Sequence, residues 1–311
     1  MKGLTSTSRR GRGPSGGATP DNPGMRIAFL GFGLIAGSVA RALHARATEP
    51  EWTLAAWSPT GSGPAAAAAG GVLDAAAADP AVAIDGADLV VLAAPPLACL
   101  DLLDRLAGPL RSALADYAVV TDVASTKRRL VARAAELELP FVGGHPMAGR
   151  EKTGYGAADA ELFVGRPWVI VADGAPAEHV ERVESLARAA GATPVRMDAA
   201  THDAAVAAVS HVPLVVAAAL VESVAGDPSG WSSARGLAAS GWRDMSRLAL
   251  GDVAMGAGIA ATNADLVAER LHRLRDVIDG WLADLEPPDG PDPERLAARL
   301  AHARALLEDV R

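Results

Sequence analysis

Two short segments of the chain carry side chains that could transfer a proton. Residues 121–127 read Thr-Asp-Val-Ala-Ser-Thr-Lys, and residues 143–151 read Gly-Gly-His-Pro-Met-Ala-Gly-Arg-Glu. An imidazole, with a reference pKa of about 6.5, suits a general base near neutral pH. His145 could instead be a structural histidine before a proline turn, and Ser125 could cap a helix that begins at Thr126. Both are candidates for catalysis, and the fold must bring them together.

A glycine-rich turn near the start of the chain is the second chemical feature. It matches G-x-G-x-x-A, follows an apolar strand-like run and opens a helical stretch. Gly31 permits the tight turn, Gly33 lets the backbone approach a pyrophosphate, and Ala36 lets the helix pack on the strand. Free N–H groups and the helix dipole would hold the pyrophosphate. We predict a dinucleotide site at Gly31, Phe32, Gly33, Leu34 and Ile35, together with Ala94 and Pro95 after the apolar run 88–93.

The end of the second strand-like run bears on the choice of nucleotide. An acidic residue there would hold the ribose 2′-hydroxyl of NAD, but residues 57–60 read Trp-Ser-Pro-Thr. The repulsion that excludes a 2′-phosphate is therefore missing, and the hydroxyls of Ser58 and Thr60 could donate to one. No arginine lies nearby in the sequence to clamp it. We expect NAD as the cofactor, with NADP allowed.

The apolar pattern predicts the elements that position these residues. Short apolar runs separated by long helical stretches indicate a mainly parallel sheet covered on both faces, with right-handed crossovers. The carboxyl ends of neighbouring strands share an edge of such a sheet, so Ser125 and His145 can meet beside the nicotinamide. Strands are expected at 26–30, 52–57, 88–93, 117–122, 141–144, 168–172 and 194–197, and helices at 34–46, 97–114, 126–137 and 177–190.

Strand signals stop at Met197, and the rest of the chain is helix-compatible. We predict a doubly wound, Rossmann-like α/β domain over residues 25–197 and an all-helical domain over residues 198–311. The apolar faces of the helical domain could form a homodimer interface. Residues 1–24 are basic and rich in Gly, Ser, Thr and Pro, and are expected to be a disordered leader. The alanine runs, 65–69 and 75–78, are interpreted as helix-forming filler.

Composition narrows the class of function. The chain has 311 residues, a length that fits two domains, and its net charge of −8 offers no basic footprint for nucleic acid. A single cysteine, Cys99, excludes an intrachain disulfide and fits a reducing, cytoplasmic compartment. Apolar stretches such as 212–221 are about ten residues long, too short to span a bilayer, so no membrane partner is expected. No Cys, His and Asp grouping has metal-ligand spacing, so no metal is expected.

Three motifs together resemble the prephenate/arogenate dehydrogenase family of tyrosine biosynthesis. They are the glycine turn, the pattern D-x-x-S-x-K from Asp122 to Lys127, and G-H-P-M-A-G-x-E-x-x-G from Gly144 to Gly154. The His-Pro-Met-Ala-Gly part is the most discriminating, and the resemblance covers roughly residues 25–263. It implies an NAD(P)-dependent oxidoreductase that converts prephenate to 4-hydroxyphenylpyruvate, or arogenate to tyrosine, by oxidative decarboxylation.

The resemblance also implies roles for the proton-transfer residues. Removal of the C4 hydroxyl proton while hydride leaves C4 gives a ketone, and loss of CO₂ then gives an aromatic ring. His145 is expected to be the base. Ser125 is expected to orient it, hydrogen-bonded to the imidazole or to the substrate hydroxyl. Lys127 is expected to support this loop and to bind substrate, and Glu151 is expected to bind substrate as a gate or as part of a proton network.

The helical domain must supply cations for a dicarboxylate substrate. Residues 241–247, Gly-Trp-Arg-Asp-Met-Ser-Arg, resemble the family's substrate-binding segment. Arg247 is therefore expected to grip a carboxylate; the alternative is a solvated arginine paired with Asp244.

A second segment of the helical domain resembles the family's S-H-x-P motif. Ser210 and His211 are expected beside the substrate, with simple helix packing as the alternative, and His202-Asp203 lies on a compatible face of the same helix. Leu214 and Met255-Gly256 depart from some family members and leave prephenate and arogenate unresolved. The chain ends without another αβ unit, so any feedback control by tyrosine is expected at the active site.

Two other hypotheses for the function compete with a prephenate or arogenate dehydrogenase. A β-hydroxyacid dehydrogenase of the same two-domain layout would place a catalytic lysine on the first helix of the second domain, but residues 198–221 contain no lysine. A non-catalytic sensor would bind the dinucleotide and give no turnover with any hydroxy acid.

Overall fold

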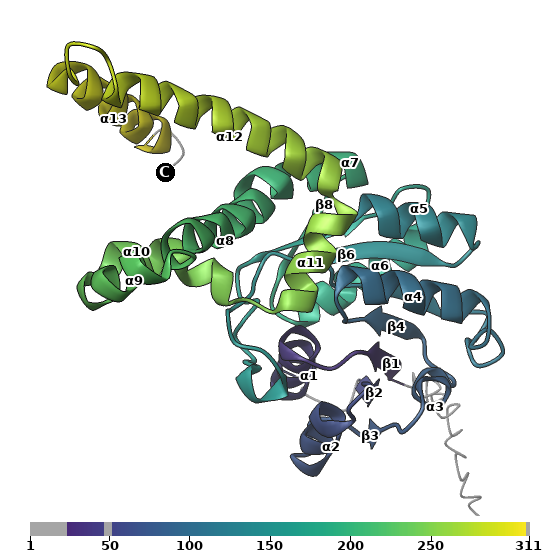
Figure 1. Ribbon diagram of the computed structural model, residues 1–311. Helices are drawn as coiled ribbons and strands as arrows, with labels where there is room; N and C mark the ends of the chain where they lie inside the picture. The colour runs from purple at the N-terminus through teal and green to yellow at the C-terminus, as the bar shows by residue number, and fades with distance from the viewer. Residues whose placement is uncertain (1–23, 47–51, 309–311) are drawn as a thin grey trace, which may run out of the picture.

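The computed structural model describes residues 24–46 and 52–308, so the expected leader lies almost wholly outside the described residues. An eight-stranded sheet forms the first part of the chain, with the strand order β3-β2-β1-β4-β5-β6-β7-β8 (Figure 1). The strands are β1 (Met25–Leu30), β2 (Trp52–Trp57), β3 (Ala75–Ala76), β4 (Leu89–Leu92), β5 (Val119–Asp122), β6 (Phe141–Pro146), β7 (Pro167–Val171) and β8 (Thr193–Arg196).

Every pairing from β3 across to β6 is parallel, so the carboxyl ends of these strands share one edge of the sheet. The direction reverses once, because β7 runs antiparallel to β6, and β8 then pairs parallel to β7. The helices associated with the sheet are α1 (Leu34–Arg46), α2 (Ser62–Ala69), α3 (Pro80–Ile84), α4 (Pro96–Ala107), α5 (Arg128–Glu136) and α6 (Ala177–Ala189). The predicted fold class, a doubly wound α/β domain followed by helices, is confirmed.

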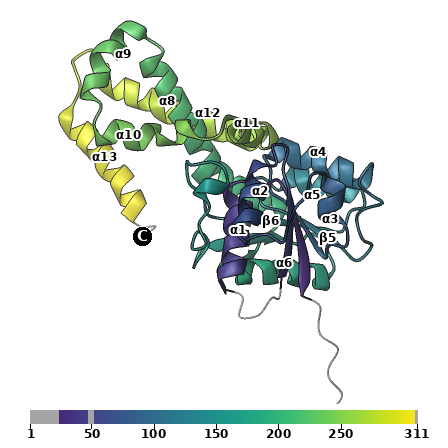
Figure 2. The ribbon, with the colours of Figure 1, turned by 90° about the horizontal axis from the view of Figure 1, so that it is seen from below.

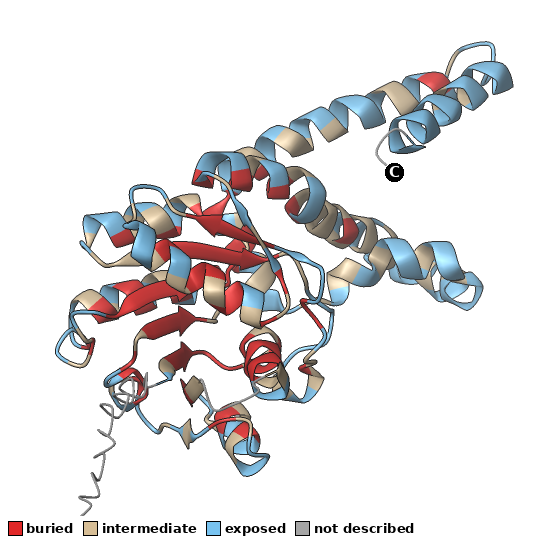
Figure 3. Cartoon of the chain, turned by 180° about the vertical axis from the view of Figure 1, so that it is seen from behind, coloured by how far each residue is buried: buried red, intermediate tan, exposed pale blue. Residues whose placement is uncertain are grey.

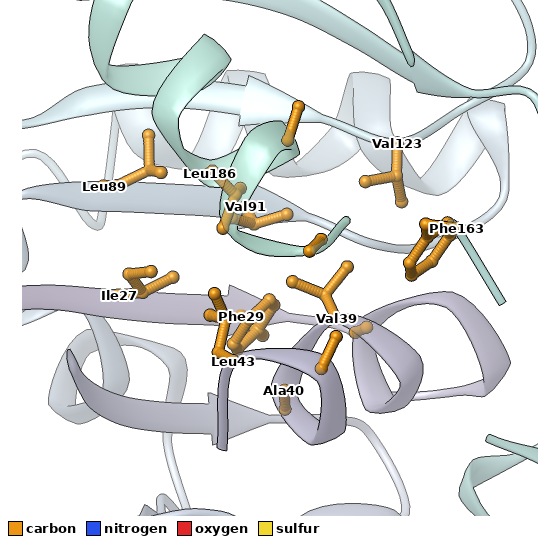
Figure 4. Close-up of a cluster of buried hydrophobic side chains, with 14 of the residues drawn as sticks. Ile27, Phe29, Val39, Ala40, Leu43, Leu89, Val91, Val123, Phe163 and Leu186 are labelled. Atoms are coloured by element: carbon orange, nitrogen blue, oxygen red, sulfur yellow. The ribbon is translucent and has the colours of Figure 1, made fainter. Parts of the chain in front are cut away.

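Two apolar clusters cover the two faces of the sheet, because alternate residues of each strand point to opposite sides. Ile27 and Phe29 of β1 face one cluster, which α1 and α6 complete (Figure 4). Ala28 and Leu30 face the other, which α3, α4 and α5 complete. Cys99 lies inside this second cluster, where burial raises the pKa of its thiol to about 12. Its thiol is therefore buried and protonated, as its apolar surroundings predict.

The rest of the chain is helical and extends away from the sheet (Figures 1 and 2). Its elements are α7 (Ala199–Val206), η2 (Ala207–His211), α8 (Val212–Ala225), α9 (Pro228–Ala234), η3 (Arg235–Leu237), α10 (Ser240–Ser246), η4 (Arg247–Leu250), α11 (Val253–Thr262), α12 (Ala264–Leu285) and α13 (Pro293–Glu308). Most of these helices are exposed along their length, in contrast to the buried strands (Figure 3). The helical part therefore leaves much apolar surface uncovered in one chain.

One helical segment differs from the sequence expectation about membranes. Residues Ala199–Ala225 form a continuous helix that is long and apolar enough, by length and composition alone, to cross a bilayer. Only 22% of its most apolar window is buried inside the structure. A single such helix is weak evidence for a membrane span, and this one carries three buried polar side chains, His202, Asp203 and His211.

Two other expectations about the elements are wrong. Residues 75–78 were expected to be helical, but Ala75–Ala76 form the edge strand β3, because two backbone positions there pair with β2. The helix expected at 97–114 ends at Ala107, because Gly108 and then Pro109 follow it. Proline disfavours the helical conformation of the residue before it, which explains the stop.

Candidate active site

The carboxyl-terminal edge of the sheet brings the two proton-transfer segments together. β5 ends at Asp122 and β6 ends at Pro146, and these strands are parallel neighbours. Ser125 follows β5 in a loop, and His145 is the penultimate residue of β6 with 9% of its surface exposed. The start of the helical domain packs on α5 through α7.

A chain of three side chains links His145 to the helical domain. Nδ1 of His145 lies 2.8 Å from Nε2 of His202, and Nδ1 of His202 lies 2.8 Å from a carboxylate oxygen of Asp203. The two imidazole rings meet edge to face, with an interplanar angle of 80°. We call these three residues the relay. His202 and Asp203 were expected on a compatible face of the same helix as Ser210 and His211, and neither was predicted as a site residue.

The relay fixes the position of each proton. An ionised carboxylate can only accept, so Nδ1 of His202 must carry a hydrogen and its Nε2 must be an acceptor. Nδ1 of His145 then donates to that nitrogen, which leaves Nε2 of His145 with a free lone pair. The pKa of His145 is lowered well below its ordinary value by burial first, and then by His202, Lys127 and His211. His145 is therefore neutral near pH 7, in the tautomer that a general base requires.

Asp203 is held as a carboxylate by donors from the dinucleotide domain. Burial raises its pKa, but hydrogen bonds from His202 and from the backbone N–H groups of Arg128 and Lys127 lower it by more. Those two backbone groups donate over 2.9 Å and 2.7 Å, respectively. The amide nitrogen of Asn263 also donates to the backbone carbonyl of Asp203, over 2.9 Å. The relay is therefore anchored from both domains.

Lys127 is buried beneath the loop that carries Ser125, and this position corrects the expectation that it binds substrate. Its side chain is fully buried and its ammonium group is ion-paired with Asp122. Asp122 also accepts the backbone N–H groups of Ala124, over 2.9 Å, and Gly144, over 3.1 Å. An ammonium group in this position cannot reach a ligand without leaving a buried carboxylate unpaired. Lys127 does join the ends of β5 and β6, as a residue that supports the loop would.

Ser125 and His211 each present a buried polar atom without a hydrogen-bond partner in the described part of the chain, namely Oγ and Nε2. His211 lies beside the backbone of Ser125, and its Nδ1 faces the amide nitrogen of Asn263 at 3.2 Å. Burial, with a contribution from His202, lowers the pKa of His211 to about 4 against the opposing effect of Asp203. Nδ1 of this neutral ring is the acceptor, so Nε2 carries the hydrogen, and it faces the backbone carbonyl of Ser125 without a hydrogen bond of good geometry. The partner of the His145 ring is His202 and not Ser125, and the Ser125 hydroxyl is left for a ligand.

A π-helical turn explains why His211 is buried while its neighbour is not. η2 interrupts the regular helix between α7 and α8, and it ends at His211. A π turn widens the helix by one residue and is often found at functional sites. His211 is 1% exposed, whereas Ser210 lies on the exposed side. The structure thus brings His211, but not Ser210, to the relay.

Arg247 of the helical domain contacts the segment that follows β6. Its guanidinium forms an ion pair with the carboxylate of Glu151, in the segment that follows β6, and the alternative pair with Asp244 is not formed. Both side chains remain partly exposed, at 53% for Arg247 and 38% for Glu151. A cavity of about 700 Å³ borders Glu151. A second cavity of similar volume lies between α4, α5 and α6 and contains none of the site residues.

The glycine turn has the shape that a dinucleotide pyrophosphate needs. Gly31 has a φ of +93°, and an added Cβ there would lie 2.4 Å from the backbone oxygen of Ala93. Gly33 has nothing within 4 Å of the same position, so its backbone is open to approach, and the first turn of α1 has no acidic residue. Phe32 and Leu34 are buried, so they can contribute only backbone atoms. These residues fit a dinucleotide at the helix N-terminus.

The end of β2 contains more than the sequence suggested. Ser58 is half-buried and Thr60 is exposed, and Oγ1 of Thr60 lies 3.1 Å from Oγ of Ser62. No arginine is nearby in the sequence, but the guanidinium carbon of Arg105, on α4, lies 5.6 Å from the centre of the Trp57 ring. A cation thus lies close to the strand end, although it is distant in the sequence. Within residues 24–46 and 52–308, no group of three or more His, Cys, Asp or Glu residues could hold a metal.

Comparison with known proteins places these features in a family. The chain matches "Prephenate dehydrogenase, nucleotide-binding domain" over residues 39–196 and "Prephenate dehydrogenase, dimerization domain" over residues 198–290. It is 31% identical over 265 residues to prephenate dehydrogenase of Bacillus subtilis, across 84% of this chain and 68% of that protein. It is 32% identical over 197 residues to prephenate dehydrogenase of Lactococcus lactis, across 62% of this chain and 53% of that protein.

A solved structure agrees with these matches. The arogenate dehydrogenase of Synechocystis superimposes with a TM-score of 0.70 at 30% sequence identity, over 91% of this chain and 100% of that chain. The two family domains divide the chain where the last strand, β8, gives way to the first helix of the second part, α7. The chain belongs to the prephenate dehydrogenase family.

Proposed function

We propose that this protein catalyses the dinucleotide-dependent oxidative decarboxylation of prephenate or arogenate. The observation that supports this most directly is the relay, which leaves Nε2 of His145 as a buried, unprotonated base at the carboxyl edge of the sheet. In the reaction, that nitrogen takes the proton of the ring hydroxyl. The bound dinucleotide supplies the acceptor for the hydride that leaves C4. The C1 carboxylate leaves as CO₂, and its bonding electrons complete the aromatic ring.

Two groups around His145 are placed to position the reacting hydroxyl. Oγ of Ser125 and Nε2–H of His211 are two of the buried polar atoms that have no hydrogen-bond partner of good geometry among the described residues. A buried polar atom without a partner is costly, so a ligand that supplies one is favoured. We assign Ser125 to the substrate hydroxyl and His211 to an adjacent oxygen of the substrate. His202 and Asp203 hold the base in its tautomer, and Asp203 stabilises the imidazolium that forms.

Arg247 is the proposed anchor for a substrate carboxylate, and Glu151 is its competitor. In the structure the guanidinium is paired with Glu151, so the ion pair joins the two domains. A carboxylate of the substrate can replace Glu151 in a bidentate contact, which releases the segment that carries it. This assigns Glu151 as a gate that competes for Arg247.

For the cofactor, we propose that the site accepts NADP as well as NAD. The described residues at the end of β2 include no carboxylate that would repel a 2′-phosphate, and Ser58, Thr60 and Arg105 are groups that could donate to one. The relative affinity for the two dinucleotides then depends on Arg105. From the sequence we expected NAD with NADP allowed. Arg105 is distant from the glycine turn in the chain, so its position near the end of β2 could not be taken into account there.

The helical domain is proposed to form a homodimer. Its second family match is to a dimerization domain, and Leu237, Leu250 and Val253 are each at least 80% exposed in the single chain. Burial of such side chains against a second copy would remove apolar surface from water. The same contact would cover the apolar helix Ala199–Ala225 with protein instead of lipid. With its single buried thiol, Cys99, such a dimer suits the reducing cytoplasm.

One assay tests the proposal. The protein is mixed with NAD or NADP and with prephenate or arogenate, and reduced nicotinamide is followed by its near-ultraviolet absorbance. We expect turnover in at least one of the four combinations, and a loss of about 10²–10⁴-fold in kcat for His145→Asn with substrate affinity retained. His272→Asn, on the exposed helix α12, is the matched control and should behave as wild type. Silence in all four combinations would refute the proposal.

A further inference from the structure

The segment between β6 and β7, residues 147–166, passes over the glycine turn and carries a tyrosine that packs against it. The ring of Tyr155 lies 5.5 Å from the ring of Phe32, centre to centre and at 30°. Phe32 in turn meets Phe29 of β1 edge to face, at 5.8 Å. The guanidinium carbon of Arg41, on α1, lies 4.6 Å from the centre of the Tyr155 ring on another side. Tyr155 is therefore held between the glycine turn and the first helix.

Gly37 shows how closely the tyrosine approaches. An added Cβ at Gly37 would lie 2.7 Å from Cδ2 of Tyr155 and 3.0 Å from Cβ of Ala158. Gly37 comes after the G-x-G-x-x-A pattern is complete, so the pyrophosphate does not explain it. Its φ is not positive, so backbone conformation does not explain it either. The absence of a side chain at this position is explained by the ring of Tyr155.

Polar contacts fix the rest of the segment along α1. Oγ of the buried Ser38 accepts the backbone N–H of Asp159 over 2.9 Å. Arg41 donates to the backbone oxygen of Ala158 over 2.7 Å, and Arg46 donates to that of Ala160 over 2.8 Å. The helix that begins at the pyrophosphate site is thus tied to this segment along its whole length.

The same segment carries Glu151, four positions before Tyr155 and paired with Arg247 of the helical domain. Between them lies the cavity of about 700 Å³, whose lining runs from Arg150 to Thr153 and from Gly156 to Asp159. Arg150 and Asp159, which both line this cavity, form an ion pair of 2.5 Å. One short stretch of chain therefore touches the proposed carboxylate anchor at one end and the dinucleotide turn at the other.

We propose that Tyr155 is a positioning residue for the dinucleotide site, and that residues 147–166 couple it energetically to the carboxylate site at Arg247. Tyr155 holds Phe32, and through it the glycine turn, in the shape that accepts a pyrophosphate. When a carboxylate releases Glu151 from Arg247, the segment keeps only its contacts with α1 and the glycine turn, so we expect each ligand to strengthen binding of the other. Such coupling is reciprocal by thermodynamic necessity. This inference rests on the proposed function for the identity of the second ligand only.

The test measures dinucleotide binding directly, by titration calorimetry on the full chain, with and without saturating 4-hydroxyphenylpyruvate. We expect wild type to bind the dinucleotide several-fold more tightly when this carboxylate is present. Tyr155→Ala should weaken dinucleotide binding about 10-fold and abolish the difference, because the aromatic and cation–π contacts are lost. Tyr155→Phe keeps the ring and should restore both properties. Tyr117→Ala, at an exposed tyrosine before β5, is the matched control and should bind as wild type.

A substitution on the opposite side of the contact gives a second test. Gly37→Ala should weaken dinucleotide binding in wild type, because its Cβ displaces the Tyr155 ring, and should do little further harm in Tyr155→Ala. If Tyr155→Ala does not fold, Tyr155→Leu replaces it. Unchanged affinity in the Tyr155 variants, or an equal loss in Tyr117→Ala, would overturn the positioning role. Equal affinity with and without 4-hydroxyphenylpyruvate in wild type would overturn the coupling. Absence of turnover would count against the proposed function alone and leave the Tyr155 comparison intact.

Discussion

Replacement of His202 by phenylalanine separates the relay from the rest of the site. The ring shape is kept, so the packing between α7 and β6 is largely preserved. In the wild type, His202 accepts from Nδ1–H of His145 and donates to Asp203, each over 2.8 Å. The variant removes both hydrogen bonds. His145 is then free to adopt the other tautomer, in which Nε2 carries the hydrogen and cannot act as a base.

The magnitude follows from these contacts. A hydrogen bond that involves a charged group contributes about 1.5–3 kcal/mol, and about 1.4 kcal/mol corresponds to a factor of ten in rate. Loss of the link to Asp203 at the moment when His145 becomes charged therefore gives a decrease of about 10–10²-fold. The wrong tautomer adds to this, up to the full value of a general base, about 10²–10⁴-fold. We expect kcat to fall about 10²–10³-fold, with the affinities for dinucleotide and substrate near those of wild type.

The pH dependence supplies an independent readout. His202 is one of the groups that lower the pKa of His145, so its removal should raise that pKa toward the ordinary value for histidine. The acid limb of kcat/KM, measured by steady-state kinetics over a range of pH, should therefore move to higher pH. His179→Phe, at a half-buried histidine of α6 outside the relay, should leave both rate and profile unchanged. A His202→Phe enzyme with kcat within about threefold of wild type and an unmoved acid limb would refute the relay.

Three further predictions concern the carboxylate anchor, the buried wall and acid stability. Arg247→Gln should raise the KM for substrate about 10–10²-fold with little change in kcat, whereas Glu151→Gln should lower the KM. Steady-state kinetics in which both variants shift the KM in the same direction would contradict the proposal that Glu151 and the substrate compete for Arg247. Lys127→Met should lower the free energy of unfolding, measured in urea, by about 3–5 kcal/mol at neutral pH, because it leaves the buried Asp122 carboxylate unpaired. Burial raises the pKa of Asp122, so this carboxylate takes a proton in acid, and the loss of stability should then become smaller. Because the folded-state pKa of His211 is about 4, the unfolded state binds the proton first. The free energy of unfolding should therefore fall by about 1.4 kcal/mol per pH unit for this group as the pH is lowered from about 6.5 to about 4. His211→Asn should remove that contribution, and an unaltered slope of unfolding free energy between about pH 6 and pH 5 would show that the ring is solvated.

The sequence predicts the dinucleotide domain well, because its signals are local. Apolar strands without alternation fix a parallel sheet, and a parallel sheet places the ends of β5 and β6 at one edge wherever the intervening helix lies. Ser125 and His145 are therefore found from motifs and topology alone. The two-residue strand β3 was missed because alanine pairs carry no strand preference of their own.

The relay could not be predicted in the same way. His202 lies 57 positions after His145, and the contact depends on how the helical domain packs against α5, which no local pattern records. The π-helical turn also shifts the helix phase between Asp203 and His211, so ordinary helical spacing misplaces Ser210. A usable signal does exist: His202, Asp203 and His211 are ionisable side chains in an otherwise apolar helix, where each must find a partner. Arg105 was missed because it is far from Trp57 in the sequence and approaches it only in the folded chain.

The reversal of β7 has a consequence for how this scaffold can change over time. A parallel crossover would return the chain to the far side of the sheet, but an antiparallel partner lets residues 147–166 leave and re-enter at the same rim. Residues can be inserted or deleted in that stretch without a shift in any strand register, because both of its ends are fixed by β6 and β7. Changes in this one segment can therefore alter the surroundings of Glu151, while His145 stays on β6, a strand that such changes do not touch.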